Sequence, residues 1–172
     1  NLVSAGEDGL LRVWKRHGRK GTKLFEITSE DIRRAAFVKG LNAFFALSDN
    51  KISIVSKNAE ILFEHEENFR IVDADISADG RYVVTTEKGA ILRFYDRESA
   101  GEKDIELKEE IRSVDISPDS DHAAVSGDTE MLLVSFKKDE VKSNKCMRDS
   151  GVRPVFSSDG KKLAAACGGT MK

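Results

Sequence analysis

Acidic residues and an arginine recur together along this chain, at intervals that place one such group near the start of each of several similar segments. Arginine presents a planar fork of donors that fits carboxylates and phosphates, so a repeated arginine can serve pairing or recognition. The residues of this pattern that we single out are Asp31, Arg33, Glu67, Arg70, Glu110, Arg112 and, with a looser spacing, Arg153.

Two interpretations of this charge pattern are compatible with each other. In the first, each acid pairs with a neighbouring arginine and helps to tie one segment to the next. Such exposed ion pairs contribute about 0–1 kcal/mol each. In the second, the groups gather on one face of the molecule and bind a partner, and we therefore carry all seven residues forward as candidate partner-binding residues.

A basic stretch at residues 15–23 is the second charged feature. We interpret it as a solvated loop, and the alternative is a contact with RNA, an anionic membrane or an acidic partner, because clustered cations attract phosphates. No aromatic residues are interleaved for base stacking, so sequence-specific reading of nucleic acid is not expected. The cations of this stretch are Lys15, Arg16, Arg19, Lys20 and Lys23.

The sequence lacks the common motifs of catalysis and cofactor binding. It contains no HExxH, no phosphate-binding glycine loop and no nucleophile elbow. Its two cysteines, Cys146 and Cys167, have no metal-ligand spacing, and two free thiols of a reducing compartment are favoured over a disulfide. We therefore expect no catalytic residue, no metal and no cofactor, and a protein of the cytoplasm or nucleus.

Composition places the chain among globular domains. Its 172 residues are 34% charged and 40% apolar, with a formal net charge of −2, which gives no global attraction for nucleic acid or acidic membranes. No apolar run approaches the ~18 residues of a membrane helix, so the chain is not expected to be transmembrane. It opens and closes inside strand-like runs and has no initial Met, so we expect a fragment of a longer protein.

The segments that position these residues repeat every 40 positions. The sequences Ile-Ser-Ala-Asp-Gly, Ile-Ser-Pro-Asp-Ser and Phe-Ser-Ser-Asp-Gly occupy residues 76–80, 116–120 and 156–160, and a degenerate copy occupies residues 37–40. Self-similarity at this period indicates repeat architecture. Asp79, Asp119 and Asp159 are expected to build turns by accepting backbone hydrogen bonds, rather than to act in catalysis or metal binding.

Each period divides into four short runs rich in β-branched and aromatic residues, separated by turn residues. This pattern predicts an all-β fold of antiparallel meanders. Helix is the weaker alternative, because glycines and Ser-x-Asp turns interrupt the chain too often. The expected strands are 32–37, 43–48, 52–55 and 61–64, then 71–76, 81–86, 91–96 and 103–107, then 111–116, 123–126, 131–136 and about 141–147.

Residues 2–15, Leu-Val-Ser-Ala-Gly-Glu-Asp-Gly-Leu-Leu-Arg-Val-Trp-Lys, resemble the strand–turn–strand that ends a WD40 repeat. Trp14 and Tyr95 hold the aromatic position of the family's Trp-Asp dipeptide, and degraded copies begin at Val55 and Phe136, at spacings of 40 or 41 residues. The resemblance implies that Trp14 and Tyr95 are structural, with Trp14 largely buried.

The chain also departs from the WD40 pattern. The family's Gly-His pair is absent, so the buried Asp-His-Ser-Trp network of regular repeats cannot form as such. Asp8 and Trp14 keep two of its members, with Ser4 a candidate third. Other propeller families with shorter signatures stay open as an alternative.

The resemblance implies a β-propeller of four-stranded antiparallel blades, with this chain covering about four blades of a ring of about seven, in a range of six to eight. Missing sequence or a second chain would supply the remaining blades. The implied divisions are an incomplete blade at 1–28, blades at 29–68, 69–108 and 109–148, and the start of another at 149–172.

The function that the resemblance implies is a non-catalytic scaffold for protein–protein interactions in a multiprotein intracellular assembly, with other proteins as its partners. One alternative is a propeller that reads phosphate groups of RNA, lipid headgroups or phosphopeptides through the arginines and the basic stretch. The other is an enzyme whose active site lies in the propeller channel.

Overall fold

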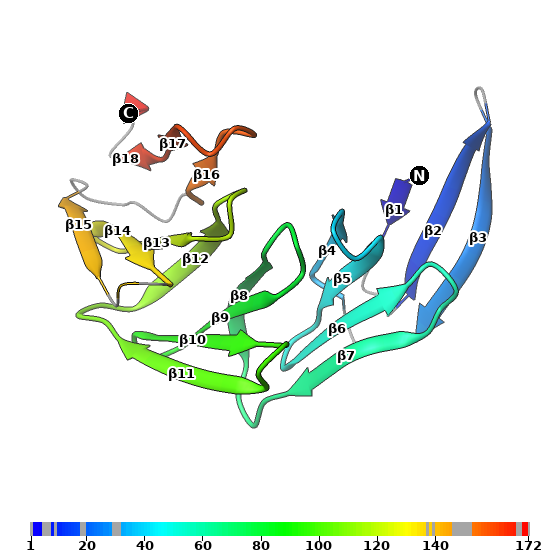
Figure 1. Ribbon diagram of the computed structural model, residues 1–172, viewed down its shortest axis with the longest axis horizontal. Coiled ribbons are helices and arrows are strands. Elements are labelled where there is room, and N and C mark those ends of the chain that lie inside the picture. The colour runs from blue at the N-terminus through cyan, green and yellow to red at the C-terminus, as the bar shows by residue number, and fades with distance from the viewer. Residues whose placement is uncertain are drawn as a thin grey trace. The chain divides into compact units, whose positions relative to one another are not determined.

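A computed structural model describes residues 2–4, 8, 10–17, 20–28, 32–136, 138, 140–145, 153–167 and 170–171, with only the backbone for some strand residues near both ends. The described residues form strands joined by turns, and the strands pair antiparallel (Figure 1). The predicted all-β fold of antiparallel meanders is therefore confirmed.

Three sheets of the described residues have four strands each, paired in chain order. The first consists of β4 (Arg34–Val38), β5 (Ala43–Leu47), β6 (Lys51–Ser56) and β7 (Ile61–Glu66). The second consists of β8 (Ile71–Ile76), β9 (Tyr82–Glu87), β10 (Ile91–Asp96) and β11 (Gly101–Glu106). The third consists of β12 (Ile111–Ile116), β13 (His122–Gly127), β14 (Glu130–Ser135) and β15 (Val141–Lys145).

Shorter sheets occupy the two ends of the chain. A three-stranded sheet contains β1 (Leu2–Ser4), β2 (Leu10–His17) and β3 (Lys20–Thr28). Two-stranded pairs are formed by β16 (Val155–Phe156) with β17 (Leu163–Ala164), and by β18 (Ala166–Cys167) with β19 (Thr170–Met171). Each of these connections is again antiparallel.

The interpretation of residues 15–23 as a loop was wrong. Strand β2 continues to His17 and β3 begins at Lys20, and these two residues are paired partners at the end of the hairpin. Only residues 18–19 lie between the strands. Lysine, arginine and glycine have low strand propensity, so local composition favoured a loop, whereas continued pairing between the two strands decides the structure.

The chain divides into two compact units, residues 1–71 and 72–172. In the first unit, Leu11 and Val13 of β2 pack with Ile32, Phe44 and Ala46. In the second, residues of β9 and β10 pack with residues of β12, β13 and β14 in one apolar cluster, whose members include Val84, Leu92, Val114, Val125 and Val134. Full burial of such side chains contributes about 1.5–3 kcal/mol each.

The described side chains of the fourth strand of each complete sheet are mostly exposed, in contrast to those of the strands before it. All five residues of β5 are buried, whereas β11 has five exposed residues and one half-buried residue. Sheet order places β7, β11 and β15 at an edge of their sheets. Exposed functional groups are therefore concentrated on the edge strands and the turns.

Candidate functional site

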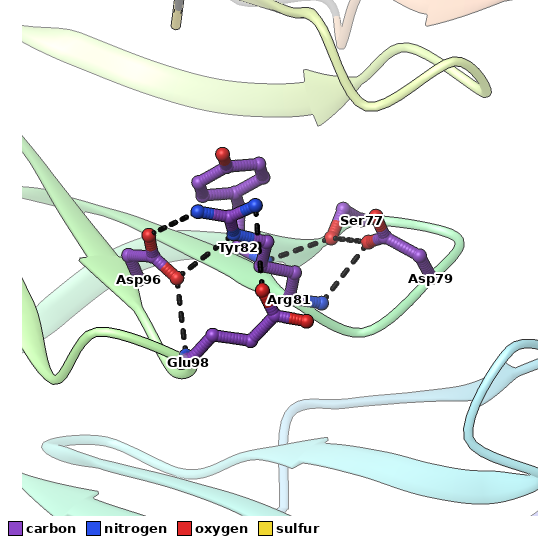
Figure 2. Close-up of polar contacts among 6 residues, drawn as sticks. All are labelled: Ser77, Asp79, Arg81, Tyr82, Asp96 and Glu98. Carbon is purple, nitrogen blue, oxygen red and sulfur yellow. Dashed lines mark hydrogen bonds and ion pairs between the residues drawn. The ribbon is translucent and has the colours of Figure 1, made fainter.

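The Ser-x-Asp segments form turns with the same hydrogen bonds in each repeat. Ser77 Oγ donates to Asp79 at 2.5 Å and accepts from Tyr82 N at 2.8 Å, and Arg81 N donates to the same carboxylate at 3.0 Å (Figure 2). Ser117 with Asp119, and Ser157 with Asp159, make the equivalent bonds at 2.5–3.1 Å.

These bonds also set the ionisation of the turn carboxylates. The hydrogen bond from the Ser117 hydroxyl lowers the pKa of Asp119, and that from Ser157 lowers the pKa of Asp159. Partial burial acts to raise the pKa of Asp79, but hydrogen bonds led by that of Ser77 outweigh it, and its pKa lies below the usual value. The three aspartates thus occupy positions within turns as charged acceptors.

A second set of aspartates, which sequence reasoning did not single out, joins successive sheets. Asp75 Oδ2 accepts a hydrogen bond from Ile116 N at 2.8 Å, and Asp115 Oδ2 accepts one from Phe156 N at 2.9 Å. The donors and the acceptors are each separated by 40 residues. In the sequence both acids open an Asp-Ile-Ser-x-Asp segment, but this repeat does not identify the distant donor of either hydrogen bond.

Arg33 is held by backbone carbonyls. Its guanidinium donates to the carbonyls of Ser48, at 3.0 Å, and Ile71, and its Nε lies 3.0 Å from Asp49 Oδ1. These three contacts, to the residue after β5, to the first residue of β8 and to the turn residue Asp49, fix the side chain in place. Arg33 is therefore better described as a structural residue than as an exposed recognition residue.

Arg70 and Arg112 are more exposed and pair with aspartates in the turns between strands. Arg70 Nε lies 3.2 Å from Asp49, so it shares that carboxylate with Arg33, and its side chain is 70% exposed. Arg112 pairs with Asp128, and its side chain is 56% exposed. These turn aspartates were not part of the predicted charge pattern.

Arg153 donates to the carbonyl of Val114 at 3.3 Å, which links it to the preceding sheet. Among the predicted acids, Glu67 is buried with its carboxylate 3.3 Å from His65 Nε2, whereas Glu110 is exposed. Asp31 lies outside the described residues.

Glu109, beside Glu110, has a structural role in the β13–β14 turn. Its carboxylate accepts hydrogen bonds from Thr129 N at 3.0 Å, Thr129 Oγ1 at 2.7 Å and Glu130 N at 2.7 Å. A Cβ at Gly127 would lie only 2.3 Å from Glu109 Oε1, so glycine gives the carboxylate room to reach the turn.

The residues of the WD40-like segment have distinct contacts. Trp14 Nε1 donates to Ser4 Oγ at 2.8 Å, and the Trp14 side chain is half-buried. Asp8 accepts hydrogen bonds from Arg12 and from Leu10 N at the β1–β2 connection. The arginine bond lowers the pKa of Asp8. The serine–tryptophan pair is thus present, and Asp8 has local partners.

Tyr95 is only 6% exposed, and Asp96 beside it binds Arg81 through two bonds of 3.0 and 2.7 Å (Figure 2). The Arg81 guanidinium also lies 4.9 Å from the centre of the Tyr82 ring and 3.3 Å from Glu98. The bidentate bond to Arg81 holds the pKa of Asp96 well below its usual range. Sequence reasoning did not predict this cluster.

A cavity of about 260 Å³ lies beside this cluster in the second unit. Aromatic rings form much of its wall: Phe136 packs edge-on against Phe94 with ring centres 5.0 Å apart, and its ring centre lies 5.2 Å from that of Tyr82. Phe136 follows β14, whereas the other rings lie on β9 and β10. The cavity therefore forms where two successive sheets meet, which a single-strand pattern does not reveal.

The basic residues at 15–23 add no side-chain contacts here, because Arg19 lies outside the described residues and only the backbone of Lys15, Arg16, Lys20 and Lys23 is described. Cys146 also lies outside the described residues. Within the described ranges, no group of three or more His, Cys, Asp or Glu side chains is placed to hold a metal ion. The same part of the chain contains no helix with the length and apolar character needed to cross a membrane.

No protein-family model matches the chain, and no curated protein matches it.

Proposed function

We propose that this chain forms part of a WD40-like β-propeller that acts as a non-catalytic scaffold for protein–protein interactions in a multiprotein intracellular assembly. The observation that carries the proposal is the repeated inter-sheet bond. The first strand of one sheet binds the first strand of the next through Asp75, and the same bond recurs 40 residues later through Asp115. Radial repetition of four-stranded sheets needs one contact to recur at a fixed interval.

Two exposed arginines, one in each unit, support a scaffold role. Arg70 and Arg112 each lie beside an aspartate of a strand-connecting turn, and both side chains are more than half exposed. Exposed ion pairs of this kind contribute little to folding, about 0–1 kcal/mol. Their charges are therefore better explained by recognition of a partner than by stability.

The experiment compares the proteins that co-purify with the tagged full-length protein and with its Arg70→Glu/Arg112→Glu variant. Quantitative mass spectrometry of the purified material, together with its elution volume in gel filtration, reports assembly. We expect the wild type to elute as part of a larger assembly and the variant to lose at least one stoichiometric partner. Its melting temperature should be unchanged, because both residues are exposed.

A matched control reverses two exposed lysines of the β14–β15 region, as Lys138→Glu/Lys142→Glu. It makes the same change in net charge and should keep every partner. If both variants keep all partners, Arg70 and Arg112 do not bind a partner. If the wild type elutes as a monomer with no stoichiometric partner, the scaffold function is wrong.

A further inference from the structure

Strand β11 has unused backbone hydrogen-bonding groups. It is the edge strand of its sheet and pairs with β10 (Figure 1). Leu107 N donates to Ala90 O at 2.8 Å, and bonded pairs alternate along an antiparallel ladder, so the next bonded pairs are Leu92–Ile105 and Phe94–Lys103. The backbone groups of the intervening residues, Glu102, Asp104 and Glu106, therefore point away from β10.

The aromatic cavity opens beside this edge. Gly101, Glu102, Lys103 and Ile105 line it from β11, and the alternate residues Gly101, Lys103 and Ile105 share one face of the strand. Gly101 contributes no side chain to this wall. A side chain that enters at this point would contact aromatic rings, which favour stacked or edge-on contacts with another ring.

The opposite face of β11 is acidic. Glu102 and Asp104 lie on it, 3.1 and 2.7 Å from Arg93 Nε, and Glu87 lies 3.9 Å from the same guanidinium. The Arg93 hydrogen bond lowers the pKa of Asp104, which keeps this carboxylate charged. Glu106, on the same face, is exposed. Arg93 thus has three carboxylates around it, and with Glu106 the face carries an excess of negative charge.

We propose that β11 binds an extended segment of a partner protein, which adds as a fifth strand to this sheet. The segment places an aromatic side chain in the cavity and basic side chains over the carboxylates of Glu102, Asp104 and Glu106. Strand addition of this kind obtains affinity from main-chain hydrogen bonds and specificity from alternate side chains. The alternation of acidic and cavity-lining residues along β11 is the feature that selects such a segment.

Charged residues on an edge strand also protect a sheet from unwanted pairing. That protection acts against neutral or acidic strands, whereas a strand with complementary charge is attracted. The acidic face therefore excludes most strands and admits a basic one. This inference rests on the proposed function in one respect: the chain is treated as a protein-binding module. The binding residues are those of β11 and do not include Arg70 or Arg112.

The probe is a synthetic peptide, acetyl-Thr-Arg-Trp-Arg-Thr-Arg-Thr-amide, titrated calorimetrically into the purified full-length protein. In an extended strand of this peptide, the three arginines project to one face and the tryptophan projects to the other. The control peptide has the same composition in the order Arg-Arg-Arg-Trp-Thr-Thr-Thr. We expect the alternating peptide to bind at least roughly tenfold more tightly than the control, which corresponds to about 1.4 kcal/mol.

Two matched double variants separate charge from backbone pairing. Glu102→Thr/Glu106→Thr removes two charges and keeps both outward N–H groups, so binding should weaken roughly fivefold. Glu102→Pro/Glu106→Pro removes the same charges and also both donors, while the bonds to β10 stay intact because proline is tolerated where the N–H of an edge strand faces solvent. Binding should fall by a further factor of roughly 30.

Three results would overturn the proposal: no binding of the alternating peptide, equal binding of the control peptide, or equal affinity of the proline and threonine variants at unchanged melting temperature. The Arg70→Glu/Arg112→Glu protein should bind the peptide as the wild type does. Failure of the peptide experiment would not contradict the proposed role of Arg70 and Arg112. Loss of partners in the Arg70→Glu/Arg112→Glu protein would not bear on the proposal for β11.

Discussion

At the scale of single residues, the aspartates of this chain divide into two roles that differ by a few positions. Asp79, Asp119 and Asp159 close turns within their own sheets, whereas Asp75 and Asp115 accept hydrogen bonds from the next sheet. Turn chemistry could be predicted, because a Ser-x-Asp segment contains both the hydroxyl and the carboxylate that it uses. The inter-sheet role could not, since its donor lies 41 residues away.

Asp96 gives a pH-dependent prediction at this scale. Its folded-state pKa is lowered by Arg81, so its contribution to stability is present above the unfolded value near about 4 and is lost as pH falls through the lower folded value. We expect the stability difference between the wild type and Asp96→Asn to shrink as pH falls below about 4. Denaturant unfolding of the full-length protein between pH 7 and acid measures this difference. A difference that stays constant across this range would show that the ion pair with Arg81 contributes nothing.

At the scale of strands and sheets, the sequence carries most of the information. Alternation, β-branched runs and turn residues predicted the bounds of β8, β10 and β12 to the residue, and those of the other strands in the three complete sheets within about two residues. The length of the β2–β3 hairpin could not be predicted, because backbone pairing extends it through residues of low strand propensity. The cavity was equally hidden, since Phe94 and Phe136 meet only when two sheets pack.

The hydrogen bond from Ile116 N to Asp75 joins two successive sheets, so removing it tests how much this bond stabilises their packing. Ile116 is only 7% exposed, so Asp75→Ala leaves the buried N–H of Ile116 without its acceptor. Such a loss typically costs about 1–3 kcal/mol. We expect a clear loss of stability of the full-length protein in thermal or denaturant unfolding. The exposed Glu110→Ala serves as the control and should change stability by no more than ~0.5 kcal/mol. Equal effects of the two substitutions would mean that the aspartate does not hold the sheets together.

At the scale of the whole molecule, repetition is the feature that supports the proposed propeller. Sheets of four antiparallel strands recur with the sequence period. In residues 72–172, the second sheet packs on the third through an apolar cluster and an aspartate bond, and a second aspartate bond joins the third sheet to β16. An open row of such sheets leaves two faces that still need covering, and closure into a ring covers both without a special cap.

A structure of the full-length protein, determined by crystallography or cryo-electron microscopy, would show whether the sheets close into a ring. We predict a closed ring of about seven four-stranded blades, completed by sequence outside this chain or by a second chain. In that ring, the bonds of Asp75 and Asp115 should join neighbouring blades. A structure in which these sheets stack in an open row, or pair with other elements without closing, would contradict the account.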